Sequence, residues 1–195
     1  MAIKSKSNPK ALVLIAEGVE EMETVIIIDV LRRANIEVVV AGVNVRTLPI
    51  VCSRGVLLSP DVRFEDIKSF DDFDVVVVPG GTGSAKIFSE NYAVKSLLRS
   101  TYDSGKILGS LCAGPLALKA AGIPRNLKLT SHPCIKGELD SVYDYQEDRV
   151  VICENLITSR GPGTTFEFVL TLVEKLVSKE VAIAIANPMF VKHKL

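Results

Sequence analysis

The chain has 195 residues, of which 48% are hydrophobic and 24% charged, a composition typical of a folded globular protein rather than a disordered one. Its 23 basic and 23 acidic residues cancel, so no net field attracts nucleic acid or an anionic membrane, and we expect neither as a partner. The apolar runs are too short to cross a bilayer. One domain over residues 1–195 accounts for this length.

The cysteines and the chain ends predict a cytoplasmic protein. The four cysteines include no Cys-x-x-Cys pair and only two histidines are present, so we expect neither a metal site nor a disulfide framework. Residues 1–10 are polar and basic, without the apolar core of a secretory signal. The last three residues, His193-Lys194-Leu195, are only faintly similar to a peroxisomal import signal, and we do not expect import.

Apolar runs and helical periodicities alternate along the chain. The run at 11–16 lacks polar alternation, as expected for a strand covered on both faces. In chain order we expect a strand at 10–16, a helix at 20–34, a strand at 36–41, a hairpin within 47–60, a strand at 74–78, a helix at 92–103, a strand at 107–111, a helix at 115–121, strands at 127–131, 150–153 and 156–159, and an amphipathic helix at 163–177. This order predicts an α/β fold with a mostly parallel sheet, helices on both faces, and a site beyond the carboxyl ends of the strands.

Cys112 stands at one of the predicted strand-to-helix junctions. It follows the strand at 107–111, and Ala113, Gly114 and Pro115 suit a tight turn that leads into a helix. A free cysteine is often simply a buried apolar residue. At this elbow, however, the free N–H groups of the helix are expected to lower the pKa of the thiol and favour a nucleophilic thiolate.

Glu23 lies near the start of the predicted helix at 20–34, among apolar neighbours. A carboxylate in the first turn would interact favourably with the helix dipole, and this would explain the position of Glu23 as it would those of Glu20 and Glu21. The alternative is that Glu23 points inward, where poor solvation and a neighbouring thiolate would raise its pKa and keep it protonated. It could then act as a general acid or base.

His132 follows the strand predicted at 127–131 and precedes Pro133, which keeps it extended. It is the only central histidine, so any imidazole chemistry must use it, although a lone histidine is often structural. Residues 159–164 read as a turn that begins the last helix.

The glycine-rich stretch Pro79-Gly80-Gly81-Thr82-Gly83-Ser84 follows a predicted strand. It lacks the third glycine of a dinucleotide-binding loop and the Gly-Lys-Ser/Thr of a phosphate-binding loop. Two interpretations stay open: a plain tight turn, or a turn whose Gly81 N–H forms half of an oxyanion hole.

Six short blocks, taken together and in order, resemble one known family. They carry the residues just discussed and run from about Lys10 to the C-terminus. The resemblance is to the PfpI superfamily and, within it, to the branch of Parkinson disease protein seven; the blocks are Glu-Glu-Met-Glu-Thr-Val at 20–25, Cys-Ser-Arg at 52–54, Val-Val-Pro-Gly-Gly at 77–81, Leu-Cys-Ala-Gly-Pro at 111–115, Thr-Ser-His-Pro at 130–133 and Thr-Ser-Arg-Gly-Pro-Gly-Thr at 158–164.

The resemblance implies a flavodoxin-like three-layer α/β sandwich, a homodimer with the helix carrying Met22 in its interface, and a cytoplasmic or also nuclear location. It implies a glyoxalase that uses no cofactor, metal or glutathione and converts methylglyoxal to lactate, and glyoxal to glycolate, through a cysteine hemithioacetal. The roles it implies are Cys112 as nucleophile, Glu23 as protonated carboxyl group, His132 as assisting group, and the backbone amides of Gly81 and Ala113 as oxyanion hole.

Two related activities of the superfamily are not expected. PfpI-type peptidases carry His directly after the cysteine, where this chain has Ala113. Glutamine amidotransferases carry Gly-x-Cys-x-Gly, and here Ser110 replaces the first glycine. The rival to the glyoxalase is a redox sensor in oxidative stress, in which Cys112 is oxidised to a sulfinate; chaperone activity and a disputed protein deglycase activity also belong to this branch.

Overall fold

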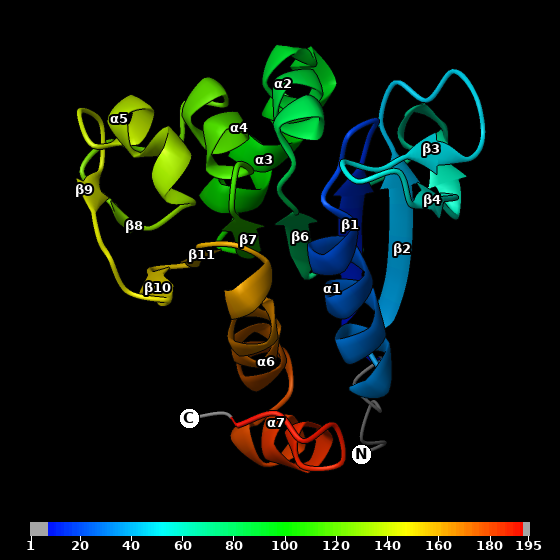
Figure 1. The fold of residues 1–195 in the computed structure, drawn as a ribbon, viewed down its shortest axis with the longest axis vertical. Coiled ribbons are helices and arrows are strands. Elements are labelled where there is room, and N and C mark those ends of the chain that lie inside the picture. The colour runs from blue at the N-terminus through cyan, green and yellow to red at the C-terminus, as the bar shows by residue number, and fades with distance from the viewer. Residues whose placement is uncertain (1–7, 193–195) are drawn as a thin grey trace, which may run out of the picture.

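The computed structural model describes residues 8–192, so the N-terminal residues 1–7 and the tripeptide 193–195 considered above lie outside the described residues. A seven-stranded sheet occupies its centre, in the order β10-β11-β7-β6-β1-β2-β5 (Figure 1). Neighbouring strands are parallel except β10 and β11. The strands are β1 (Lys10–Ile15), β2 (Glu37–Gly42), β5 (Val62–Arg63), β6 (Val75–Val78), β7 (Ile107–Leu111), β10 (Val150–Cys153) and β11 (Leu156–Ser159).

Helices cover both faces of this sheet and confirm the predicted flavodoxin-like α/β sandwich. One face carries α1 (Glu21–Arg33), α6 (Thr165–Leu176) and α7 (Lys179–Ala186), with α1 packed on α6. The other carries α2 (Thr82–Glu90), α3 (Tyr92–Asp103), α4 (Pro115–Ala120) and the short α5 (Lys136–Leu139). In the part of the chain that the structure describes, no helix has the length and apolar character needed to cross a membrane.

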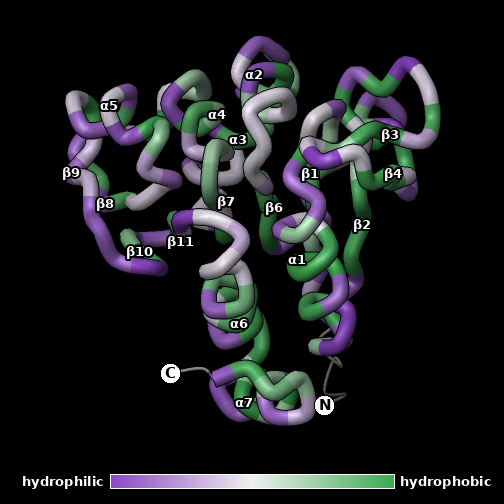
Figure 2. The backbone as a smooth tube through the Cα atoms, viewed as in Figure 1, coloured by the Kyte–Doolittle hydropathy of each residue, from purple (hydrophilic) through white to green (hydrophobic). Residues whose placement is uncertain are grey.

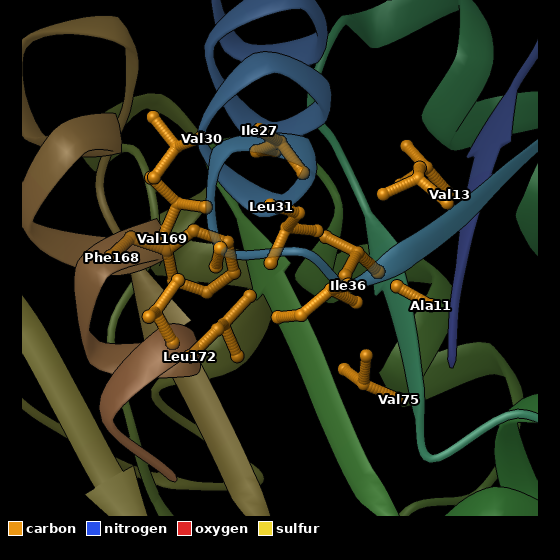
Figure 3. Close-up of a cluster of buried hydrophobic side chains, with 14 of the residues drawn as sticks. Ala11, Val13, Ile27, Val30, Leu31, Ile36, Val75, Phe168, Val169 and Leu172 are labelled. Carbon is orange, nitrogen blue, oxygen red and sulfur yellow. The ribbon is translucent and has the colours of Figure 1, made fainter. Parts of the chain in front are cut away.

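The core is divided between the two faces by the pleat of the strands. In β1, Val13 faces the α1 and α6 side while Leu12 and Leu14 face the α2, α3 and α4 side, and all three are fully buried. Figure 3 shows where α1 meets α6 over the sheet: Ile27, Val30 and Leu31 lie against Phe168, Val169 and Leu172. Figure 2 shows β2 and β6 in hydrophobic colour along most of their length. These apolar runs lack alternation because helices cover both faces of the sheet.

Two small sheets lie outside the central one. The hairpin predicted within 47–60 contains the antiparallel pair β3 (Ile50–Val51) and β4 (Leu57–Leu58). The strand predicted at 127–131 is shorter: β8 (Lys128–Leu129) pairs with β9 (Asp144–Tyr145) and does not join the central sheet. Its following residues instead leave the sheet and bring His132 to Cys112.

Three of the helices described here were not predicted from the sequence: α2, the short α5 and α7. α2 begins directly after Gly81, within the glycine-rich stretch, because Gly81 adopts a φ of +98° and serves as the residue before the first helical turn. α7 follows Ser178, whose side chain accepts a hydrogen bond from the Val181 N–H. That Ser cap was the available sequence signal.

Candidate active site

The predicted site residues meet at the carboxyl edge of the sheet, where a parallel α/β fold places its sites. The loop after β6 supplies Gly80 and Gly81, and the elbow after β7 supplies Cys112 and Ala113. Glu23 reaches the same place from the first turn of α1, and His132 from the segment after β8.

Cys112 occupies the elbow in a left-handed backbone conformation, with a φ of +57°. For a residue other than glycine this conformation is uncommon and costs on the order of 1 kcal/mol, so the surrounding structure must hold it in place. Two backbone hydrogen bonds do so: the Cys112 N–H donates to the Ser159 carbonyl (3.1 Å), and the Cys112 carbonyl accepts from the His132 N–H (3.0 Å). The side chain is half-buried.

Glu23 points into the protein and is 0% exposed. One carboxyl oxygen, Oε2, accepts a 2.7 Å hydrogen bond from the Gly80 N–H, while Oε1 is buried with no hydrogen-bond partner among the described residues. Burial raises the pKa of Glu23 to about 7, against the lowering effect of the Gly80 N–H. Glu23 therefore holds its proton well above the pH at which an ordinary carboxyl group loses it.

The Glu23 carboxyl group and the Cys112 thiol are neighbours, because a Cβ on Gly80 would lie within 3 Å of both, and each affects the pKa of the other. Burial and the charge of Glu23 raise the pKa of Cys112, while the N–H groups of Gly81 and Ala113 lower it by a smaller amount. The expectation that the elbow alone lowers this pKa is therefore wrong: desolvation outweighs the helix N-terminus. Because like charges repel, the pair holds one negative charge at most near neutral pH. A thiolate forms there only while Glu23 keeps its proton.

Glycine is required at Gly80 and Gly81 for two different reasons. A Cβ on Gly80 would lie 2.7 Å from Glu23 Oε2 and 2.8 Å from Cys112 Sγ, so only glycine lets the loop pack this closely against both side chains. A Cβ on Gly81 would collide with the backbone oxygen of Gly18. The stretch is thus a turn, as one interpretation held, and its Gly81 N–H also acts on the sulfur of Cys112.

His132 borders the site through its ring. Its Nδ1 accepts a 3.2 Å hydrogen bond from the Cys134 N–H, which in the neutral imidazole leaves the proton on Nε2. The ring also flanks Gly161: a Cβ at Gly161 would lie 3.5 Å from His132 Cδ2 and 3.9 Å from Glu23 Oε1. His132 and Glu23 therefore face the same small space.

Glu21, two residues before Glu23, has a different environment. Its Oε2 accepts a hydrogen bond from the Ser53 hydroxyl and its Oε1 accepts one from the Arg54 N–H, both at 2.8 Å. Burial acts to raise the pKa of Glu21, but hydrogen bonds from its own backbone, Ser53 and Arg54 together lower it. Glu21 thus fastens the β3–β4 hairpin to α1 as a carboxylate.

Thr164 organises the loop that covers the site, a role that the sequence did not indicate. Its buried hydroxyl oxygen accepts hydrogen bonds from the N–H groups of Arg160 (3.2 Å) and Gly161 (3.1 Å) and lies 2.7 Å from the Ser159 hydroxyl. Through Ser159, which binds the Cys112 N–H, this hydroxyl also supports the elbow.

Thr164→Val is expected to lower the free energy of unfolding by about 1–3 kcal/mol, because it leaves two loop N–H groups without their acceptor. Thr164→Ser keeps the hydroxyl and is expected to retain most of that stability. Urea denaturation of both variants measures the difference. A larger loss in Thr164→Ser than in Thr164→Val would mean that the methyl group, and not the hydroxyl, carries the effect.

The other three cysteines are free thiols outside this constellation. Cys52 is buried, and burial together with the nearby charges of Glu21 and Glu17 raises its pKa to about 11. Among residues 8–192 there is no cluster of three or more His, Cys, Asp or Glu side chains that could hold a metal ion.

Comparison with known proteins adds a family and several close relatives. Residues 9–175 match the model of the DJ-1/PfpI family. The chain is 45% identical to the Parkinson disease protein 7 homolog of Danio rerio over 95% of this chain and 99% of that one. It is 38% identical to the glutathione-independent glyoxalase DJR-1.2 of Caenorhabditis elegans, over 94% and 97% of the two chains. The crystal structure of Drosophila melanogaster DJ-1beta superimposes with a TM-score of 0.91 at 44% identity, covering 95% of this chain and 99% of that one.

Proposed function

The chain belongs to the DJ-1/PfpI family, and from this premise we propose that it is a glutathione-independent glyoxalase that converts methylglyoxal to lactate and glyoxal to glycolate. The observation that carries the proposal is the fully buried Glu23 carboxyl group beside the Cys112 sulfur, both lying against Gly80; burial raises the pKa of Glu23 to about 7. The worm relative that carries this activity in its name supports it.

In the proposed reaction Cys112 is the nucleophile and Glu23 transfers protons. The Cys112 thiolate attacks the aldehyde carbon of methylglyoxal and forms a hemithioacetal, whose oxygen carries the negative charge. The N–H groups of Gly81 and Ala113 act on the sulfur of Cys112, so they are placed to donate to an oxygen on the carbon bonded to it. Their role as oxyanion hole is part of the proposal.

The second half of the reaction is an internal redox exchange. The hemithioacetal oxygen first takes the proton of Glu23, which leaves Glu23 as a carboxylate. Glu23 then takes the hydrogen of the former aldehyde carbon as a proton, which gives an enediol, and returns this proton to the neighbouring carbon. The aldehyde carbon is thereby oxidised to a thioester and the ketone carbon reduced to an alcohol. Water then hydrolyses the thioester, releases lactate and restores the thiol. Since both electrons stay within the substrate, the scheme uses no cofactor.

His132 assists by binding or protonating a substrate oxygen. Its Nδ1 is occupied by the Cys134 N–H, so the Nε2 proton is the one available for donation. A neutral donor suits an enediol oxygen that gains and loses negative charge during the reaction.

The test is lactate formation from methylglyoxal by the purified protein in buffer without glutathione. We expect steady turnover that persists after dialysis against a chelator, measured with lactate dehydrogenases specific for each enantiomer. No lactate, or lactate only when glutathione is added, would contradict the proposal.

A redox sensor is the second candidate, and the same pair of side chains favours it. A protonated Glu23 beside Cys112 could donate a hydrogen bond to a sulfinate, which would stabilise that oxidation state. Mass spectrometry after mild peroxide treatment distinguishes it: a sensor gains two oxygens on Cys112 quantitatively and forms no lactate when reduced.

A homodimer is also proposed, with α1 in the interface. This helix exposes Met22 at 57% and Val25 at 47%, which is unusual for large apolar side chains on one helix face. Analytical ultracentrifugation tests the dimer. The cytoplasmic or nuclear location stays a prediction.

A further inference from the structure

The backbone of Gly161 leaves room for one further carbon atom next to the site. Gly161 is buried, and its φ of 165° is extended backbone that any residue adopts. Around the position that a Cβ would take, apart from the neighbouring residues of the chain, only His132 Cδ2 at 3.5 Å and Glu23 Oε1 at 3.9 Å lie within 4 Å. Both distances are ordinary van der Waals contacts, so a methyl group fits there without displacing either atom.

Two of the groups around this space, the His132 ring and the Glu23 carboxyl group, can take part in proton transfer. Glu23 Oε1 is fully buried, has no hydrogen-bond partner in the described chain, and faces Gly161. A buried oxygen without a partner costs on the order of 1–3 kcal/mol, which a substrate oxygen or hydrogen could relieve. The third wall, the backbone of residues 159–161, is fixed by the Thr164 hydroxyl.

This placement relates the space to one part of the substrate. In the proposed reaction the aldehyde carbon is bonded to Cys112, and Glu23 must reach both that carbon and its neighbour. The neighbouring carbon, with its substituent, therefore lies on the Oε1 side of the carboxyl group, where Gly161 is. The substituent is a methyl group in methylglyoxal and a hydrogen in glyoxal.

We propose that Gly161 is the specificity-determining residue of the site, because its missing side chain leaves room for the substituent on the ketone carbon of a 2-oxoaldehyde. This inference rests on the proposed function and deepens it. Alanine at this position fills the room, so the enzyme comes to prefer glyoxal, the smaller substrate.

Gly161→Ala is a suitable test because nothing in the fold opposes it. Its backbone is extended, and the new methyl group displaces no atom. Gly163→Ala is the matched control: Gly163 lies in the same loop, and a Cβ there would meet nothing within 4 Å. We expect both variants to unfold at urea concentrations close to that of the unmodified protein.

The expected result is a change in substrate preference. For Gly161→Ala, kcat/KM for methylglyoxal falls by roughly tenfold or more relative to kcat/KM for glyoxal, the scale of discrimination that one carbon produces in a tight pocket. The ratio stays unchanged in Gly163→Ala. If Gly161→Ala lowers both values equally, or neither, the inference is wrong.

A second measurement needs no turnover. Methylglyoxal and glyoxal are each expected to protect Cys112 from alkylation by iodoacetamide by forming the hemithioacetal. Gly161→Ala should raise the methylglyoxal concentration needed for protection by about tenfold while changing the glyoxal concentration much less. Protection with this shift but no lactate would overturn the proposed function alone. Lactate formation with an unchanged ratio would overturn only the role of Gly161. Absence of protection in the unmodified protein would overturn both.

Discussion

Replacing Cys112 by alanine is expected to abolish lactate formation from methylglyoxal, with a loss of about 10³-fold or more in kcat. The sulfur is the only proposed point of covalent attachment, and without it the substrate carbon is never held beside Glu23. Lactate is measured over hours, so that a slow residual rate is detected. Because the alanine removes only one atom from a half-buried position, the fold is expected to remain.

Cys153→Ala is the control for this experiment, since Cys153 is also half-buried but ends β10 away from the site. It should keep the activity of the unmodified protein. Retained lactate formation in Cys112→Ala would end the proposal of a covalent intermediate, and equal losses in both variants would point to a general effect of removing a thiol.

Replacing Glu23 by glutamine is expected to lower kcat by about 10²–10⁴-fold, the usual contribution of a positioned acid or base. The amide oxygen can still accept the hydrogen bond that the Gly80 N–H gives to Oε2. The amide cannot take up a proton from carbon, so binding is preserved while proton transfer is lost. Steady-state kinetics should show this loss in kcat with little change in KM.

Glu20→Gln is the matched control on the same helix end. The Glu20 carboxylate accepts a 2.7 Å hydrogen bond from the Glu23 N–H, and an amide oxygen can accept the same bond. Near-normal activity in Glu20→Gln would separate proton transfer by Glu23 from capping of α1. If Glu23→Gln retained full activity, another group would have to move the proton.

Glu23 should also make stability depend on pH. Its folded pKa of about 7 lies above the usual 4.5, so the native protein binds this proton more tightly than the unfolded chain does. The resulting stabilisation is complete below about pH 4.5 and is lost as the pH rises through 7, a change of about 3 kcal/mol. Urea unfolding at several pH values measures this. Between pH 4.5 and 8 the free energy of unfolding of Glu23→Gln should rise, relative to that of the unmodified protein, by about this amount. Parallel profiles would contradict the assignment.

The strands were predictable because a buried strand appears in the sequence as a short apolar run. Val75–Val78 is an uninterrupted apolar run and Ile107–Leu111 a mostly apolar one, each next to turn residues, and the structure places strands there. The start of α2 was hidden, because glycines at 81 and 83 read as a loop and only the contact between Gly81 and Gly18 makes the turn obligatory. That contact joins residues far apart in the chain, so the sequence around Gly81 does not indicate it.

The site was predictable in its residue types but not in its energetics. Cys112, Glu23 and His132 lie at strand or helix ends, which topology brings to one edge of the sheet. The direction of the Cys112 pKa was not predictable, since it depends on how completely the neighbouring loops exclude water. Thr164 and Gly161 were missed for a related reason: their importance comes from hydrogen bonds and empty space within a folded loop.

Glu21 and Glu23 have opposite titration behaviour although they stand two positions apart. The pKa of one is lowered and that of the other is raised to about 7. Across mildly acidic to neutral solution, the ionised Glu21 keeps the hairpin tethered while the inner acid gains or loses its charge. A change in the charge of Glu23 over this range therefore leaves the hydrogen bonds from Glu21 to Ser53 and Arg54 in place.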